Sequence, residues 1–386
     1  PNLDRMAADG VRFNHCYSQP LCTPSRVKIM TGQYNARNYR TFGALHPEEK
    51  TFAHLLRNAG YATCVAGKWQ LAARGGGKGT YPRKAGFDQY CLWQIDKRGP
   101  RYADPLIRKT GQDKPRRYKG EYGPDIFCRY LTDFMAQNRD RPFFAYYSMC
   151  LPHRPFCPTP DSPEWSEDRN QRDPKFFSDM VTYVDTLVGR IARKLEDLGL
   201  REDTLILFTG DNGTHTGIKA RMEDGSVIRG GKGLTIDAGI HVPLIASWPS
   251  VAPAGRGSDE MVGFSDFLPT IAQVAGADLP EDVSIDGRSF LPILRGAEQD
   301  RRDWLYCWYQ IKGGYRYPAR LGGTAREFTF DRRWKLYDNG ELYNTRRDPR
   351  EKEPITEGQG GAAARSARKK LRSALTSVHR SLDESG

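Results

Sequence analysis

The strongest constraint on the fold is the segment of residues 180–209, where a helical pattern gives way to a strand pattern. Apolar side chains recur there at helical spacing: Val184, Leu187, Val188, Ile191 and Leu195. Gly199 is expected to end this helix. The run at 204–209 is almost continuously apolar, which is typical of a central parallel strand covered on both faces. A helix followed directly by such a strand predicts an α/β fold.

The same alternation recurs along the first three hundred residues. Residues 52–56 form a helical pattern that Gly60 closes. Strand patterns cover residues 61–66, ending at Gly67, residues 142–149, of buried type, and residues 242–248. We therefore expect a large, mainly parallel sheet sandwiched between helices.

The pattern changes near residue 300. Short aromatic segments follow at 304–309, 328–330, 334–337 and 341–343. Asn339-Gly340 lies between two of them and is a hairpin signal, so we expect a small antiparallel sheet. The predicted organisation is a large α/β domain at 1–300, an antiparallel subdomain at 301–357, and a final segment at 358–386. In that segment a Gly/Ala-rich linker at 358–364 precedes a basic amphipathic helix at 365–382.

Charge narrows the possible partners. The chain has 386 residues, of which 59 are basic and 47 acidic, giving a net charge of +12. Such a charge favours a polyanion: nucleic acid, an anionic membrane or a sulfated polysaccharide. Nucleic acid is the weakest of these because no recognised binding motif accompanies the charge. No apolar run approaches the roughly 20 residues of a transmembrane helix. The basic segment 97–119 is either a solvated loop or a rim that attracts an anionic substrate.

The eight cysteines form no C-x-x-C pair, which argues against zinc and thioredoxin-like sites and leaves the cellular compartment open. One of them begins the pentapeptide Cys22-Thr23-Pro24-Ser25-Arg26. This resembles the C-x-P-S-R motif of the formylglycine-dependent, arylsulfatase-like sulfatases of the alkaline-phosphatase superfamily. The flanking residues 1–13 and 30–34 resemble the family's flanking segments.

That resemblance implies an alkaline-phosphatase-like sheet, mixed but mostly parallel. It also implies that a formylglycine-generating enzyme oxidises Cys22 to formylglycine. One hydroxyl of the aldehyde hydrate would attack sulfur, and the sulfo-enzyme would then expel sulfate as the aldehyde re-forms. Arg26 would orient the formylglycine and balance negative charge.

Two further segments resemble segments of the family that carry a lysine. Residues 67–71 resemble its G-K-W-H-L segment, so Lys68 would contact both the formylglycine and the sulfate. Gln70 departs from the family's histidine and cannot take a proton at neutral pH, so release needs another base or is slow. Residues 230–245 resemble the lysine-bearing segment, where Lys232 would hold the bridging ester oxygen.

Two histidines are candidates with different support. His153 lies in a stretch that resembles the family's P-H-x-P, which implies contact with the leaving oxygen; a lone histidine after a strand is more often structural. His215 follows Asn212 by three residues and is either a substrate contact or a surface histidine.

Asp211-Asn212-Gly213 directly follows the apolar strand. Taken alone it is an ordinary turn or a pair of oxygen ligands for a hard cation. The resemblance implies calcium, with magnesium as a possible substitute, held by Asp211 and Asn212 against the sulfate oxygens. The family's first strand carries two more aspartate ligands, and the resemblance begins after it. We therefore expect unpaired strand edges, weak calcium binding and weak activity from this polypeptide.

The predicted function is hydrolysis of a sulfate ester of a carbohydrate or an aryl alcohol, in the periplasm or outside the cell. Selectivity would depend on loops that include residues 97–119 and 310–327. Two alternatives stay open. One is a phosphonate or phosphate-diester hydrolase that uses the same modified cysteine. The other is an inactive relic that binds sulfated glycans, which Gln70 and the net charge favour.

Overall fold

The computed structural model describes residues 1–73, 78–297, 302–310 and 326–384. Its α-helices are α1 Asn2–Ala8, α2 Cys22–Thr31, α3 Asn35–Asn38, α4 Phe52–Asn58, α5 Gly123–Gln137, α6 Trp165–Asp168, α7 Phe176–Asp197, α8 Asp237–Ile240, α9 Phe267–Ala275, α10 Leu291–Leu294 and α11 Gly361–Asp383. Its strands are β1 Val11–Tyr17, β2 Ala62–Lys68, β3 Gln89–Trp93, β4 Leu106–Lys109, β5 Arg116–Arg117, β6 Phe143–Ser148, β7 Ile206–Thr209, β8 Lys219–Arg221, β9 Val227–Arg229, β10 His241–Ser247, β11 Arg256–Gly263, β12 Leu305–Tyr309, β13 Arg326–Phe330, β14 Trp334–Tyr337 and β15 Leu342–Asn344. None of the described helices is long and apolar enough to cross a membrane.

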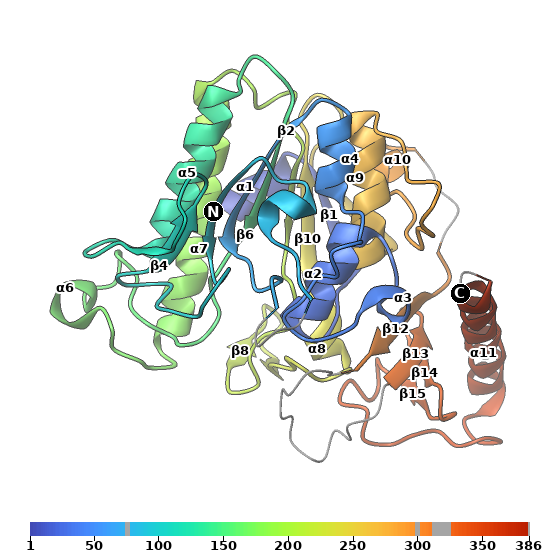
Figure 1. Cartoon of the computed structure of the whole chain (residues 1–386). Helices are drawn as coiled ribbons and strands as arrows, with labels where there is room; N and C mark the ends of the chain where they lie inside the picture. Colours follow the sequence, from blue (N-terminus) through green and yellow to red (C-terminus); the bar gives the residue numbers. More distant parts are fainter. Residues whose placement is uncertain (74–77, 298–301, 311–325, 385–386) are drawn as a thin grey trace.

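The predicted α/β class with a mixed sheet is confirmed, but among the described residues the expected large sheet is divided into two, beside the C-terminal sheet and the hairpin β8-β9 (Figure 1). One has the order β11-β1-β10-β7 and the other β5-β4-β3-β2-β6. Neighbours run parallel in β1/β11, β2/β3 and β2/β6. The strand β10 runs antiparallel to both β1 and β7, and the basic segment 97–119 contributes the antiparallel strands β4 and β5.

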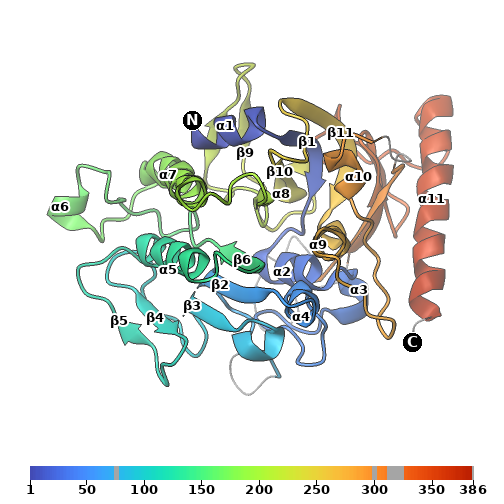
Figure 2. The same ribbon diagram turned by 90° about the horizontal axis from the view of Figure 1, so that it is seen from above.

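Helices cover both faces of the strands, as Figure 2 shows from above. Along β2, Val65 enters one apolar core, with side chains of α4 and α9, while Cys64 and Ala66 enter another, with side chains of α5 and α7. This alternation follows from the two-residue period of a strand. It explains why β2 is buried along its whole length.

The strands β6 and β7 differ from the prediction. We expected a buried strand at 142–149 and a central parallel strand at 204–209. Each is instead the last strand of its sheet among the described residues, and the single partner of β7 runs antiparallel. Both are therefore half-buried, apart from the buried Ser148, and both line one cavity of about 1430 Å³.

Most element boundaries agree with the sequence patterns. The helices α4 and α7 lie where predicted, and Gly60 and Gly199 follow them in left-handed conformation. The strand β2 was expected to end at Gly67 but continues to Lys68. Gly67 has φ +102°, and a Cβ there would lie 2.0 Å from the Ser148 carbonyl oxygen. Glycine at this position thus allows the close approach of β6 rather than ending the strand.

The predicted C-terminal antiparallel sheet is confirmed as β12-β13-β14-β15, with Gly340 in left-handed conformation in the turn after β14. The predicted linker at 358–364 is wrong in part because α11 begins at Gly361, and Ala364 is buried against the sheet. The two boundaries between the three predicted segments stay predictions. Residues 298–301, around the first boundary, and 311–325, within the expected selectivity loop, lie outside the described residues.

Candidate active site

All nine predicted site residues line the cavity between β6 and β7. These residues are Cys22, Arg26, Lys68, Gln70, His153, Asp211, Asn212, His215 and Lys232. They come from the start of α2, the end of β2 and the residues just after it, the segments that follow β6 and β7, and, for Lys232, the loop between β9 and α8. The fold thus brings together residues that are more than two hundred positions apart in the sequence.

Cys22 is the first residue of α2. Leu21 before it is extended. The preceding turn is fixed by Ser25, whose hydroxyl accepts from the Gln19 amide and donates to the Gln19 carbonyl, both at 3.1 Å. The first turn of a helix carries partial positive charge on its unpaired N–H groups. Cys22 therefore occupies a position that favours a negatively charged atom.

The thiol of Cys22 is buried, and its Sγ lies 3.4 Å from Oε1 of Gln70. Burial by itself raises the pKa of this thiol, but the ammonium groups of Lys68 and Lys232 more than offset that effect. Asp211 opposes them, yet the pKa of Cys22 falls below its usual value. The surroundings thus favour an anion at the Cys22 side chain.

Arg26 lies one turn of α2 beyond Cys22 and is 2% exposed. Its Nη1 donates to the carbonyl oxygen of Trp69. Its Nε and Nη2 are buried without a partner in the described part of the chain. Because an unsatisfied buried donor costs roughly 1–3 kcal/mol, these two atoms could accommodate an acceptor that is not among the described residues.

The backbone after β2 is shaped for the site. The amide of Trp69 donates to the Trp93 carbonyl at 2.9 Å, and the amide of Gln70 donates to the Gln94 carbonyl at 3.0 Å. Gln70 has φ +52°, an unfavourable conformation for a residue with a side chain. The two hydrogen bonds hold this conformation.

The glycine run before Lys232 allows its loop to pack closely. A Cβ on Gly230 would lie 2.3 Å from the His215 carbonyl oxygen. The amide of Lys232 donates to the Thr214 carbonyl at 2.9 Å, and the next amide donates to the Pro20 carbonyl at 2.8 Å. These contacts join the loop to the segment that carries Cys22 and bring the Lys232 charge close enough to lower the thiol pKa.

His153 is half-buried, and its Nδ1 lies 2.7 Å from the carbonyl oxygen of Arg154. That contact requires a proton on Nδ1, and the nearby Nη2 of Arg101 at 3.2 Å then cannot donate to the same atom. Burial, Lys232, Lys68 and Arg101 hold the pKa of His153 far below its ordinary value. In this tautomer the imidazole is neutral and Nε2 is an acceptor.

Arg101 is the site residue that sequence reasoning missed. In the sequence it is only one of several cationic residues in the basic segment 97–119. It is 4% exposed, its guanidinium lies 4.6 Å from the Trp93 ring centroid, and it lines the cavity beside His153. The sequence carried no signal for this burial because Trp93 lies on β3, whereas Arg101 lies in the irregular segment between β3 and β4.

Asp211 and Asn212 provide side-chain oxygen atoms that could bind a cation. Asp211 is exposed, while Asn212 donates through Nδ2 to the Gly213 carbonyl at 3.0 Å and leaves a buried Oδ1 without a partner. No group of three His, Cys, Asp or Glu side chains that could hold a metal occurs in the described residues. His215 is half-buried and packs edge-on against Phe156, and burial lowers its pKa.

Comparisons with known proteins identify the family of this chain. The sulfatase family profile matches residues 1–277, and a profile described as N-sulphoglucosamine sulphohydrolase, C-terminal, matches residues 231–381. Human arylsulfatase A is 33% identical over 90% of this chain and 72% of its own length. Dog N-acetylgalactosamine-6-sulfatase is 31% identical over 88% of this chain and 69% of its own length.

Solved structures show the same fold at lower identity. One, described as in complex with its substrate D-glucosamine-2-N,6-O-disulfate, has a TM-score of 0.76 and 23% identity, covering 100% of this chain and 93% of that one. The phosphonate monoester hydrolase of Agrobacterium radiobacter has a TM-score of 0.73 and 20% identity, covering 99% and 91%.

Proposed function

Because this chain belongs to the sulfatase family of the alkaline-phosphatase superfamily and is a sulfuric ester hydrolase, we propose that it removes sulfate from a sulfated carbohydrate through formylglycine made from Cys22. Small aryl sulfates would serve as alternative substrates. The observation that carries the proposal is the surroundings of Cys22. Two ammonium groups lower its pKa, and two unpaired donors of Arg26 lie one helical turn away.

The proposed reaction needs positive charge where negative charge builds up. When present, the formylglycine hydrate supplies the hydroxyl that forms a bond to sulfur as the ester S–O bond breaks. Lys68 would lie against the sulfate, and Lys232 against the departing ester oxygen. Buried, preorganised charges of this kind are typically the largest contribution to such a rate enhancement.

His153 would handle the proton of the leaving alcohol. Its Nε2 is an acceptor in the structure because Lys232, Lys68 and Arg101 hold its pKa down. A bound sulfate ester offsets these charges, and the developing negative charge offsets them further. His153 would then take up a proton from solvent on Nε2 and give it to the alcohol oxygen, while the proton of the attacking hydroxyl leaves to solvent.

Asp211 and Asn212 would hold a calcium ion, since the buried Oδ1 of Asn212 has no partner among the described residues. Calcium would supply positive charge beside the sulfate oxygens. It needs six to eight oxygen ligands, and the site offers these two side chains. We expect the 386-residue chain to bind Ca²⁺ more weakly than low micromolar in calorimetry. Low-micromolar binding or tighter would contradict this.

The experiment for the reaction class uses protein produced with a formylglycine-generating enzyme. Release of sulfate from an aryl sulfate and from sulfated sugars is compared with hydrolysis of a phosphonate monoester and a phosphate diester. We expect the sulfate esters to have the higher kcat/KM. A preference for the phosphorus substrates would favour the alternative hydrolase. Sugar binding without turnover of any ester, with formylglycine present, would favour the inactive relic.

A further inference from the structure

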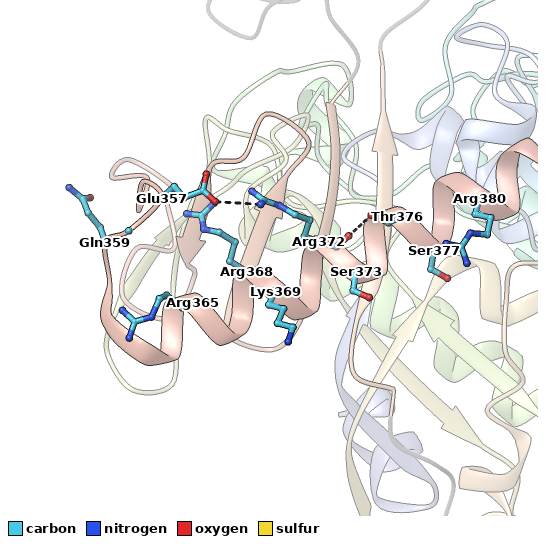
Figure 3. A pocket seen from close by; sticks show the side chains of 11 residues that line it. Glu357, Gln359, Arg365, Arg368, Lys369, Arg372, Ser373, Thr376, Ser377 and Arg380 are labelled. Carbon is cyan, nitrogen blue, oxygen red and sulfur yellow. Dashed lines mark hydrogen bonds and ion pairs between the residues drawn. The ribbon is translucent and has the colours of Figure 1, made fainter.

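The C-terminal helix α11 carries a stripe of cationic and hydroxyl side chains. We define the α11 stripe as Arg365, Lys369, Arg372, Ser373, Thr376, Ser377 and Arg380, which line one open groove of about 740 Å³ (Figure 3). Arg365, Lys369, Arg372, Thr376 and Arg380 follow one another at steps of three or four residues and so share one face of the helix. At 1.5 Å per residue the stripe is about 22 Å long.

The opposite face of α11 holds the helix in place. Leu371, Leu375 and Val378 are buried against the C-terminal sheet or the aromatic side chains beside it. Arg368 belongs to this inner side, since its guanidinium donates to the carbonyl oxygens of Gly340 and Ile355. The fold uses these residues to attach the helix, and the stripe faces solvent.

Most cationic side chains of the stripe form no ion pair within the described part of the fold. Elsewhere on the helix, Lys370 pairs with Asp331, and His379 pairs with Glu327 at 2.6 Å. In contrast, Arg365, Lys369 and Arg380 have no carboxylate partner in the described part of the chain. The remaining cation, Arg372, has only an exposed contact of 3.4 Å with Glu357. Like charges one turn apart destabilise a helix by a few tenths of a kcal/mol, so the stripe costs stability.

The lining of the groove selects among anionic partners. The planar guanidinium groups can donate bidentate hydrogen bonds to two oxygens of one oxyanion, and the hydroxyls add donors and acceptors for sugar or sulfate oxygens. Binding of single-stranded nucleic acid relies on aromatic platforms, and membrane insertion relies on apolar side chains. The groove lining contains neither. A length of about 22 Å fits several charges of one polymer better than one small anion.

We propose that the α11 stripe is a second binding site, for a sulfated polysaccharide, separate from the catalytic cavity. The inference rests on the proposed function for the nature of the polymer. Figures 1 and 2 place α11 at the edge of the molecule, with the sheet β12–β15 between it and the helices α5 and α7. A polymer held there would keep its other sulfate groups at high effective concentration near the cavity.

The test compares two charge-matched variants. The stripe variant combines Arg365→Gln, Lys369→Gln, Arg372→Gln and Arg380→Gln. The control variant combines Arg5→Gln, Arg57→Gln, Arg83→Gln and Arg193→Gln, which are exposed arginines on other elements. Both lose four positive charges. Affinity for a heparin oligosaccharide and for its desulfated form is measured at several salt concentrations, together with turnover of a small aryl sulfate.

We expect the stripe variant to bind heparin about tenfold or more weakly at low salt and to lose most of the salt dependence. The control variant should bind nearly as the parent does, and aryl sulfate turnover should not change in either. Equal loss in both variants would overturn the proposal, because net charge would then explain binding. Tighter binding of single-stranded DNA than of heparin would also overturn it.

The same measurement on Cys22→Ala keeps this proposal separate from the proposed function. Binding that persists in Cys22→Ala and is lost in the stripe variant supports the second site even when no sulfate is released. Loss of sulfate release alone therefore bears on the proposed function and not on the α11 stripe.

Discussion

The molecule has two cationic regions that are built in different ways. Around Cys22, three cationic side chains come together in a cavity that is partly shielded from water. They are Arg26 from α2, Lys68 from the end of β2 and Lys232 from a glycine-rich loop. On α11, the charges stand in a row, each open to solvent. Converging buried charges perturb the chemistry of one atom, whereas a row of exposed charges is screened by salt and acts through its sum.

This difference predicts that single substitutions matter in the first region and combined substitutions matter in the second. The α11 stripe should tolerate any one change. A single substitution of Arg26, Lys68 or Lys232 should instead impair the site around Cys22, because each of these charges acts on a small number of atoms at close range. The predictions below test the first region in order of expected effect.

The largest effect is expected for Cys22→Ser. A serine can accept the sulfo group but cannot expel it as an aldehyde re-forms, so catalysis should stop after one turnover at most. Sulfate release is followed under multiple-turnover conditions, with intact-mass analysis for a stable sulfo adduct. Cys128→Ser is the matched control, since Cys128 is buried between α5 and α7 and is not part of the cavity. Sustained turnover by Cys22→Ser would contradict the account.

Removing one converging charge should have the next largest effect. Lys68→Ala and Lys232→Ala should each lower kcat by about 10²–10³-fold, as loss of a preorganised charge does in other enzymes. In unmodified protein, either change should also raise the pKa of the Cys22 thiol, read from the pH dependence of its alkylation. Lys219→Ala, an exposed lysine of β8, is the control. An unchanged thiol pKa would show that the charges do not act on this atom.

Gln70→His is expected to have a smaller effect, which is an increase in kcat. The Oε1 of Gln70 lies 3.4 Å from Sγ of Cys22, so a histidine there could take the proton that glutamine cannot. We expect kcat to rise about tenfold or more with KM nearly constant. Gln70→Leu, which removes the polar contact, should lower kcat. A lower kcat in Gln70→His would mean that another residue already serves as the base.

The smallest effect is expected for the contribution of His153 to the pH dependence of folding stability. Its pKa in the fold lies far below 6.5, so at acidic pH the unfolded chain binds a proton that the native chain does not. Its contribution to stability is therefore present above about pH 6.5 and is lost as the pH falls. Urea midpoints at about pH 7 and pH 5 should differ less for His153→Gln than for the parent. An equal or larger difference would contradict the stated effect of Lys68, Lys232 and Arg101.

The sequence predicted local features well and pairings less well. Apolar spacing located α7, and Asn339-Gly340 located a turn of the C-terminal sheet, because these signals lie within a few residues. The sequence could not predict that β7 runs antiparallel to its neighbour, because an apolar run does not indicate which strand pairs with it. The burial of Arg101 depends on Trp93 from β3, and the start of α11 depends on contacts of Ala364 with the sheet. Such contacts have no local pattern.

The central claim is that Cys22 becomes formylglycine, and peptide mass spectrometry tests it most directly. Trypsin should release residues 13–26, which contain both Cys22 and Cys16, so the second cysteine is an internal control. In protein produced with a formylglycine-generating enzyme, we predict a loss of about 18 Da at Cys22 and an unmodified thiol at Cys16. Two unmodified thiols in that peptide would contradict the account.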